Sequence, residues 1–160
     1  MGRLQDKRLF LLDMDGTIYL DDRLFEGVTA FLSRIREKGG RYLFLTNNSS
    51  KGVEGYIEKL NGMGIATGRE DSLTSVDAAI DLLRRRYPGR RCYGQGTRSL
   101  YDQLAAAGIP VTCDREDGAE ILLSGFDREL TFQKLEDACI LLNRGVIWLA
   151  TNPDWVCPTW

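Results

Sequence analysis

One short stretch near the N-terminus, residues 8–17, limits most strongly how this chain of 160 residues can fold. Its sequence is Arg-Leu-Phe-Leu-Leu-Asp-Met-Asp-Gly-Thr, in which an apolar run ends in two acids, Asp13 and Asp15, and then in turn-forming residues. An apolar run this short is typical of a strand buried on both faces of a parallel sheet. Ligands bind at the carboxyl ends of such strands, so we expect Asp13 and Asp15 at the mouth of a site.

A second strand should lie beside the first. Apolar residues at helical spacing over 28–35 predict an amphipathic helix, and the apolar run 42–45 predicts another buried strand. That run ends in the polar residues Thr46, Asn47 and Asn48. A strand, a helix and a strand form a right-handed crossover, which brings both carboxyl ends to one edge of the sheet. We therefore expect these three polar residues beside the two acids.

The rest of the chain continues the alternation of helices and strands. Residues 18–25 predict a small hairpin, and helical spacing recurs at 53–60 and 76–83. Pro88-Gly89 breaks the pattern, and we expect a domain boundary there. The pattern then predicts a strand at 91–93, a helix at 99–107, an extended segment at 109–112, a strand at 120–123, a helix at 131–142 and a strand at 146–150. The sequence thus predicts an α/β fold in two parts, 1–87 and 88–160.

Composition excludes several classes of protein. The chain is 43% hydrophobic and 28% charged, which argues against a membrane protein, and its net charge of -2 provides no basic footprint for nucleic acid. The four cysteines are scattered without a Cys-x-x-Cys pair, which is typical of reduced cysteines in a cytoplasmic protein. Histidine is absent, which removes Ser-His and Cys-His nucleophile pairs and leaves carboxylates, Lys, Tyr and hard metal ions as the groups available for catalysis.

The residue types at the predicted sheet edge suit phosphoryl transfer. A carboxylate nucleophile divides phosphate ester hydrolysis into two steps through an aspartyl-phosphate, provided that a metal ion offsets the repulsion between anions. Asp13, fixed at the end of its strand, is the natural nucleophile, and Asp15 could protonate the leaving oxygen and then activate water. Thr46 would offer its hydroxyl, and Asn47 and Asn48 their N–H groups, to the phosphoryl oxygens.

Two motifs resemble those of the haloacid dehalogenase superfamily of phosphatases. Residues 11–17 are similar to the first motif of that family, Asp-x-Asp-Gly-Thr, and residues 45–48 to the second, a Ser or Thr at the end of the next strand. More narrowly, the chain resembles subgroup IIA, which includes 4-nitrophenylphosphatase-like, nucleotide monophosphatase and pyridoxal-phosphate phosphatase proteins. Stretches at 125–127, 131–135 and 150–154 resemble the α/β cap domain of that subgroup.

The resemblance implies a fold, a function and a set of roles. The fold would be a Rossmann-like core with a parallel sheet over residues 1–87 and an α/β cap over 88–160. The function would be that of a Mg²⁺-dependent phosphatase, a phosphoric monoester hydrolase acting on a small phosphorylated metabolite, with no nucleic-acid or membrane partner. Asp13 would be the nucleophile and a Mg²⁺ ligand. Asp15 would be the acid and base and would bind Mg²⁺ through its backbone carbonyl, and Thr46 would bind phosphate.

The chain also departs from the family pattern. The third motif, a Lys, and the fourth, a Gly-Asp followed by a further acid that completes the Mg²⁺ site, follow the cap in the family, and this sequence has neither. Residues 151–160 contain two prolines and no further periodic element. We therefore expect the N-terminal part of such a phosphatase, incomplete in core and cap, with little or no activity. The alternative is a non-catalytic remnant or binding module that keeps the fold.

Three further features leave alternatives open. Asn152 and Asp154 could reach the substrate from the cap, or they could simply make an Asx turn. Residues 94–97, Gly-Gln-Gly-Thr, could cradle a phosphate, although a tight strand-to-helix turn is the favoured interpretation. Exposed surface of the cap could pair two copies in a homo-oligomer.

Overall fold

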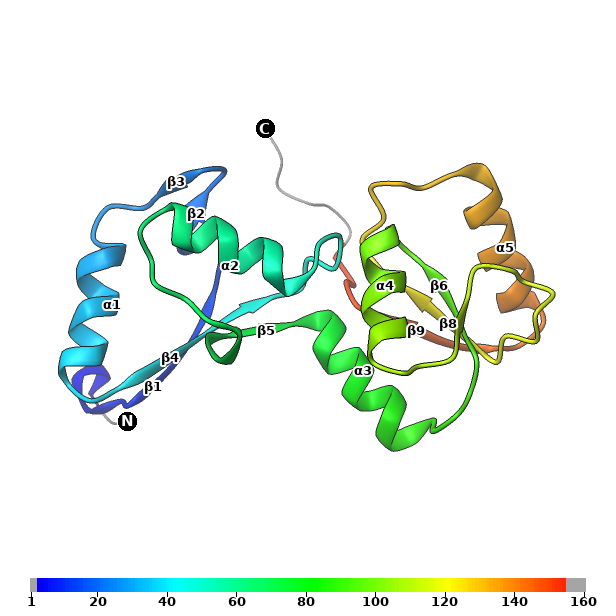
Figure 1. The fold of residues 1–160 in the computed structure, drawn as a ribbon, viewed down its shortest axis with the longest axis horizontal. Helices are drawn as coiled ribbons and strands as arrows, with labels where there is room; N and C mark the ends of the chain where they lie inside the picture. The colour runs from blue at the N-terminus through cyan, green and yellow to red at the C-terminus, as the bar shows by residue number, and fades with distance from the viewer. Residues whose placement is uncertain (1–2, 155–160) are drawn as a thin grey trace. The chain divides into compact units, whose positions relative to one another are not determined.

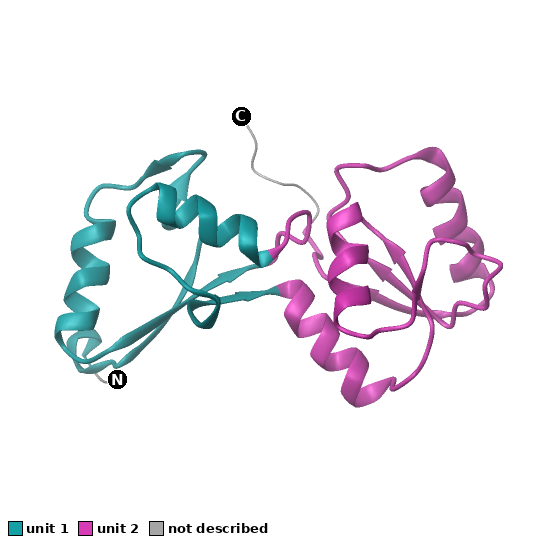
Figure 2. Cartoon of the chain, viewed as in Figure 1, with its two compact units in different colours: residues 1–46, 53–74 teal, residues 47–52, 75–160 magenta. Residues whose placement is uncertain are grey.

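A computed structural model describes residues 3–154 of the chain. Contacts divide the described residues into two compact units (Figure 2), the first made of 3–46 and 53–74 and the second of 47–52 and 75–154. Each unit contains a parallel sheet covered by helices (Figure 1). The predicted α/β fold class is therefore confirmed.

The first unit is built on a three-stranded parallel sheet in the order β1 (Leu9–Asp13), β4 (Arg41–Thr46) and β5 (Ser72–Thr74). Helix α1 (Val28–Glu37) connects β1 to β4, and helix α2 (Val53–Gly62) leads from β4 toward β5. Two right-handed crossovers in the same direction place both helices on one face of the sheet. The predicted sequence of strand, helix and strand is thus confirmed.

The two faces of this sheet differ in burial. On the covered face, Tyr42 and Phe44 are buried in one core with residues of both helices. On the other face, Leu9 is 61% exposed and Leu11 is 58% exposed. The expectation that this first strand is buried on both faces is wrong for the described residues. The reason is that α1 and α2 both pack on the face that carries Tyr42 and Phe44, and the outward leucines of β1 join none of the described cores.

A small antiparallel hairpin follows β1. It consists of β2 (Tyr19–Leu20) and β3 (Arg23–Leu24), as residues 18–25 predict. Two short 3₁₀ turns, η1 (Leu4–Asp6) and η2 (Arg69–Asp71), precede β1 and β5. Tyr19, the first residue of the hairpin, is buried in the core of the first unit and so ties the hairpin to it.

The second unit contains a four-stranded parallel sheet. Its strands lie in the order β7 (Val111–Thr112), β6 (Cys92–Gln95), β8 (Ile121–Ser124) and β9 (Ile147–Ala150). The register pairs each residue of β8 with one residue of β6 and one of β9, so the carboxyl ends of these three strands form one edge.

Three helices cover this second sheet. Helices α3 (Ser75–Arg86) and α4 (Arg98–Ala106) pack on the face that carries Ile121, whereas α5 (Phe132–Asn143) packs on the face that carries Leu122. Neighbouring residues of β8 thus belong to different cores because side chains alternate along a strand.

The junctions between the compact units do not coincide with Pro88-Gly89. Helix α3 belongs to the second unit, because Val76 and Leu83 pack in one core with Cys92 of β6. Gly89, at a φ of 76°, turns the chain between α3 and β6. The division into domains 1–87 and 88–160 stays a prediction, and the chain passes between units at 46–47, 52–53 and 74–75.

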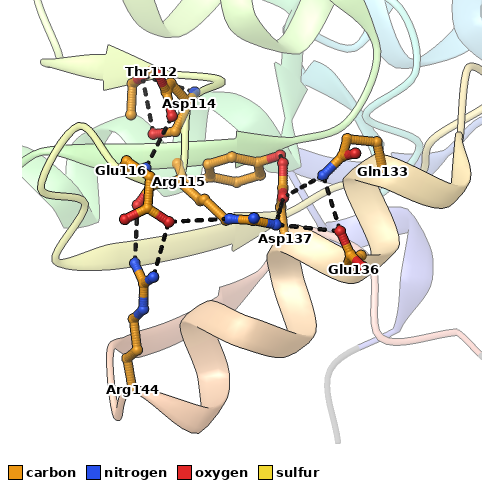
Figure 3. A network of polar contacts seen from close by, with 9 residues as sticks. Thr112, Asp114, Arg115, Glu116, Gln133, Glu136, Asp137 and Arg144 are labelled. Carbon is orange, nitrogen blue, oxygen red and sulfur yellow. Dashed lines mark hydrogen bonds and ion pairs between the residues drawn. The ribbon is translucent and has the colours of Figure 1, made fainter.

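The inward face of α5 carries an acid in a polar network (Figure 3). Asp137 is 6% exposed and accepts hydrogen bonds from the Tyr93 hydroxyl at 3.0 Å, the Arg115 guanidinium at 2.7 Å and the Gln133 amide at 2.8 Å. Arg115 lies in the loop between β7 and β8, so the network joins that loop to α5 and β6. Burial of the carboxylate is tolerated because three donors satisfy it.

Helix α5 also carries apolar side chains on the side that faces away from the sheet. Phe132 is 81% exposed, and Leu135 and Cys139 on the same stripe are also exposed. The residues that pack on the sheet, Ala138 and Leu141, form a different stripe of the helix. Helix α5 therefore presents apolar surface on two sides.

Three cysteines of the described chain are free thiols. Cys92 is buried, and Cys113 and Cys139 are exposed. Cys157 and the rest of the predicted irregular ending, residues 155–160, lie outside the described residues. Within residues 3–154, every helix is too short or too polar to cross a lipid bilayer.

Candidate active site

The two predicted acids flank the start of a tight turn after β1. Asp13 and Asp15 are exposed, whereas Met14 between them is buried in the core. The N–H of Ile18 donates to the Met14 carbonyl at 2.9 Å, and Gly16 adopts a φ of 77°, a conformation that glycine reaches without strain. The alternation of side chains thus buries Met14 and leaves both carboxylates at the carboxyl end of β1.

The Thr17 hydroxyl restrains the first acid. Its Oγ1 donates a hydrogen bond to Asp13 Oδ2 at 3.3 Å, across the glycine turn. Sequence reasoning gave Thr17 no role beyond its place in the motif. The signal that could have identified it is its position four residues after Asp13, with a glycine between them that lets the chain fold back.

Asp13 and Thr46 lie at the same edge of the first sheet. In the parallel pairing of β1 and β4, Asp13 is the register partner of Leu45, and Thr46 is the next and last residue of β4. The Thr46 side chain is buried and that of Asp13 is exposed. The crossover therefore brings the two strand ends together, as the sequence predicts.

Asn47 and Asn48 follow Thr46 but belong to the second unit. Asn47 Nδ2 donates to Asp154 Oδ2 at 2.6 Å, so two residues that are 107 positions apart meet. Asn48 Oδ1 accepts hydrogen bonds from the backbone N–H of Ser50 at 3.1 Å and from its hydroxyl at 2.7 Å. The predicted contact of these asparagines with phosphate stays a prediction.

The residues predicted at the far end of the chain form a local turn. The N–H of Asp154 donates to Asn152 Oδ1 at 2.9 Å, which is the geometry of an Asx turn. This supports the turn interpretation, while a substrate contact of Asn152 and Asp154 stays a prediction.

The glycine-containing segment 94–97 also forms a turn. Thr97 is the N-cap of α4, and its Oγ1 accepts the N–H of Leu100 at 3.4 Å. Its hydroxyl in turn donates to the Ser50 carbonyl at 3.1 Å. The polar groups of Thr97 are thus occupied by the protein, which favours the strand-to-helix turn over a phosphate cradle.

A buried tyrosine lies near the second acid. Tyr19 is fully buried, and within the described chain its hydroxyl has no hydrogen-bond partner. Burial raises the pKa of the Tyr19 phenol, and the negative charge of Asp15 raises it further. The Lys59 ammonium lies 4.0 Å from the centre of the Tyr19 ring. Near neutral pH this phenol stays protonated.

The two acids provide a small set of ligands for Mg²⁺. This ion prefers oxygen ligands and is commonly held by one or two carboxylates together with substrate phosphate and water. Within residues 3–154, no group of three or more acidic, cysteine or histidine side chains could hold a metal ion. Asp13 and Asp15 therefore fit Mg²⁺ only as such a minimal set.

A cavity of about 430 Å³ in the first unit lies apart from this edge. Its lining includes Lys7 and Phe10 near the start of β1 and Phe31 and Ile35 of α1, but neither acid nor Thr46. Its basic and apolar lining carries none of the groups predicted for phosphoryl transfer, so the strand ends are the better candidate for an active site.

Comparison with known proteins agrees with the two motifs. A family model described as haloacid dehalogenase-like hydrolase matches residues 10–110, which is well over half of the chain. An acid sugar phosphatase of Staphylococcus aureus is 31% identical over 155 residues. This match covers 97% of the chain and 59% of the relative, so the chain spans about 59% of the length of the curated relatives it matches.

Solved structures agree with the fold. A 4-nitrophenylphosphatase from Thermotoga maritima is 39% identical, with a TM-score of 0.90, over 97% of this chain and 58% of that chain. A glycerol phosphate phosphatase from Mycobacterium tuberculosis, solved in complex with magnesium, is 30% identical, with a TM-score of 0.88, over 97% of this chain and 47% of that chain. From the matched family model, these neighbours and the two motifs, the chain belongs to the haloacid dehalogenase-like hydrolase family, in its subgroup IIA.

Proposed function

We propose that this protein is a Mg²⁺-dependent phosphatase that hydrolyses a small phosphorylated metabolite through an aspartyl-phosphate. The observation that carries the proposal is the register of β1 and β4, which brings the Asp13 carboxylate and Thr46 to one edge of the sheet. Family membership supports the same chemistry, since the similar proteins named above are all phosphatases of small molecules by name.

The reaction takes two steps. In the first, a carboxylate oxygen of Asp13 forms a bond to phosphorus, the ester P–O bond breaks, and the carboxyl proton of Asp15 passes to the leaving oxygen. In the second, Asp15 takes a proton from water as the water oxygen attacks phosphorus, and the bond from phosphorus to Asp13 breaks. Inorganic phosphate leaves, and both carboxyl groups return to their starting states.

The remaining groups hold the phosphoryl oxygens and the nucleophile. The Thr46 hydroxyl and the N–H groups of Asn47 and Asn48 would donate hydrogen bonds to those oxygens. The Thr17 hydroxyl restrains the nucleophilic carboxylate. Mg²⁺, held by Asp13 and the backbone carbonyl of Asp15, would supply the positive charge that lets an anionic carboxylate approach an anionic phosphate.

A second candidate is a non-catalytic module that keeps the fold. What favours it is that the described residues contain no group of three or more side chains that could hold a metal ion, and that Asp13 and Asp15 are both exposed.

The test is the Mg²⁺-dependent release of 4-nitrophenolate from 4-nitrophenyl phosphate. Because the sequence lacks the third and fourth family motifs, we expect only weak turnover by the chain. That turnover should be lost in Asp13→Asn and unchanged in Glu26→Gln, which removes one exposed acid of the same unit. Acid quenching followed by mass spectrometry should find a phosphoryl group on Asp13 that hydroxylamine removes. Equal background release by the chain and by Asp13→Asn would support the non-catalytic module.

A further inference from the structure

The turn formed by residues 47–52, here called the linker turn, belongs to the second unit although the chain on both sides of it belongs to the first. It begins directly after Thr46 and contains both asparagines of the proposed phosphate site. Ser49 at its centre is 0% exposed. A polar side chain this buried must find its partners within the protein.

Ser49 finds them at the carboxyl edge of the second sheet. Its Oγ accepts the backbone N–H of Phe126 at 2.8 Å and lies 2.7 Å from the Thr151 hydroxyl oxygen. Phe126 follows β8, and Thr151 directly follows β9. One hydroxyl thus joins the linker turn to two neighbouring strands.

The chain has room for this contact because of a glycine. A Cβ atom at Gly125 would lie 3.0 Å from Ser49 Oγ and 2.9 Å from Leu100 Cδ2. Both distances are shorter than ordinary Cβ contacts, so the Ser49 and Leu100 side chains would have to shift. Gly125 therefore lets the backbone after β8 approach the linker turn.

Three further hydrogen bonds hold the ends of the turn to the same unit. The Thr97 hydroxyl donates to the Ser50 carbonyl at 3.1 Å, and the Ser75 hydroxyl donates to the Asn47 carbonyl at 3.1 Å. The Asn47 amide donates to Asp154 at 2.6 Å. Contacts from four separate segments thus surround Ser49 and leave the turn few alternative conformations.

We propose that Ser49 is a positioning residue, which fixes the backbone of Asn47 and Asn48 by anchoring the linker turn to the ends of β8 and β9. It does not itself touch the substrate. The inference rests on the proposed function for the role of the two asparagines, but the anchoring is a property of the fold. The backbone position of Thr46 is fixed by its place in β4, whereas the backbone of the next two residues is held by contacts within the second unit.

Amide hydrogen exchange of the full chain tests the anchoring without any substrate. Ser49→Ala removes the acceptor of the Phe126 N–H, and Thr151→Val removes the neighbouring hydroxyl while keeping its shape. We expect exchange at Ser50 and Phe126 to become roughly tenfold faster in Ser49→Ala, and faster by a smaller factor in Thr151→Val. The amides of β4 should keep their rates in both variants.

Two control variants separate positioning from general loss of stability. Thr151→Ser keeps the hydroxyl, so it should exchange like the unmodified chain at Ser50 and Phe126. Thr112→Ala removes a buried hydroxyl at the end of β7 whose hydrogen bonds within the described residues are local, to the backbone of Asp114, so it should leave these two amides unchanged. Unchanged exchange at Ser50 and Phe126 in Ser49→Ala would overturn the proposal.

Steady-state kinetics then test whether the anchoring of the linker turn affects the binding of phosphate. With 4-nitrophenyl phosphate and Mg²⁺, Ser49→Ala should raise KM and the inhibition constant for inorganic phosphate several-fold more than it lowers kcat, and Thr112→Ala should change neither. If the unmodified chain shows no turnover while the exchange results hold, the proposed function fails and the anchoring stands. If turnover is present and Ser49→Ala leaves KM and phosphate inhibition unchanged, the positioning role fails.

Discussion

Thr17 donates its hydroxyl hydrogen to Asp13 across the turn that ends β1, over a distance of 3.3 Å. The hydrogen bond can restrain the rotation of the carboxylate, which a nucleophile needs in order to meet phosphorus along one direction. Both side chains are exposed, so the contribution of this bond to folding is small.

We predict that Thr17→Val lowers kcat for 4-nitrophenyl phosphate about fivefold, because it removes the donor and keeps the shape of the side chain. Thr17→Ser keeps the donor and should lower kcat much less. The thermal midpoint should change little in either variant. Equal losses of kcat in the two variants would show that the methyl group of Thr17 matters and its hydroxyl does not.

The Asp137 network predicts a dependence of stability on pH. Burial raises the pKa of Asp137, but hydrogen bonds from Gln133, Tyr93 and Arg115 outweigh it, so the pKa is lowered overall. Because this pKa is lower in the folded state, the ionised carboxylate stabilises the protein at pH values above its unfolded pKa of about 3.9. The stabilisation is lost as the pH falls through the pKa of Asp137 in the folded protein. Urea denaturation at pH 7 and at successively lower pH should show a falling free energy of unfolding. The fall should be smaller in Asp137→Asn, which has no carboxyl group to titrate at this position.

Removing the acid should also destabilise the protein at neutral pH. In Asp137→Ala, Arg115 and Gln133 still donate to Glu136, but the buried Tyr93 hydroxyl loses its acceptor, so we expect a loss of about 2–3 kcal/mol in the free energy of unfolding. Asp102→Ala is the matched control, since it removes an exposed acid that pairs only within α4. A loss of the same size in both variants would contradict a special role for the network.

The exposed stripe of α5 predicts self-association. Phe132 and Leu135 are large, apolar and exposed on one side of the helix, and such surface is commonly covered by a partner. If two copies pair through the second unit, the sedimentation coefficient of the chain should rise with concentration, and Phe132→Ser should abolish the rise. Leu4→Ser, at an exposed leucine of the first unit, is the control and should leave it unchanged. A concentration-independent coefficient for the unmodified chain would contradict pairing.

The three described cysteines should differ in reactivity. Burial raises the pKa of the Cys92 thiol to about 12, so almost none of it is thiolate at pH 8. Cys113 and Cys139 are exposed. Iodoacetamide under native conditions, followed by peptide mass spectrometry, should therefore label Cys113 and Cys139 and spare Cys92. Labelling of Cys92 at a comparable rate would show that its core opens readily.

The local elements of the fold could be predicted because apolar periodicity reports them directly. The runs that became β1 and β4, and the stripe that became α1, depend on side chains a few residues apart. The common edge of Asp13 and Thr46 then follows from the parallel pairing of the two strands that the helix connects. This edge is the part of the candidate site that sequence alone could predict.

Apart from the hydrogen bond of Thr17 to Asp13, which spans four positions, the main omissions concern contacts between distant residues. The burial of Asp137 depends on Arg115 and Tyr93, which lie 22 and 44 positions away. The anchoring of Ser49 depends on Phe126 and Thr151, which lie 77 and 102 positions away. Local spacing carries no information on such partners.

The domain boundary expected at Pro88-Gly89 stays a prediction, and the signal behind it is local in the same way. These residues end a helix, and that is a local event. Whether the helix belongs to the unit before or after it depends on where Val76 and Leu83 pack, and they pack with β6. A turn signal therefore marks the end of an element, and it carries no information on the unit in which that element packs.

The outward leucines of β1 have a practical consequence for handling the protein. Leu9 and Leu11 point to water from a strand whose outer backbone groups have no ladder partner in the described chain. An unpaired apolar edge is a template for another strand, so concentrated solutions of this chain should tend to precipitate as intermolecular β-structure. A lysine in place of Leu11 would oppose that tendency, since burying its charge against a second chain is costly.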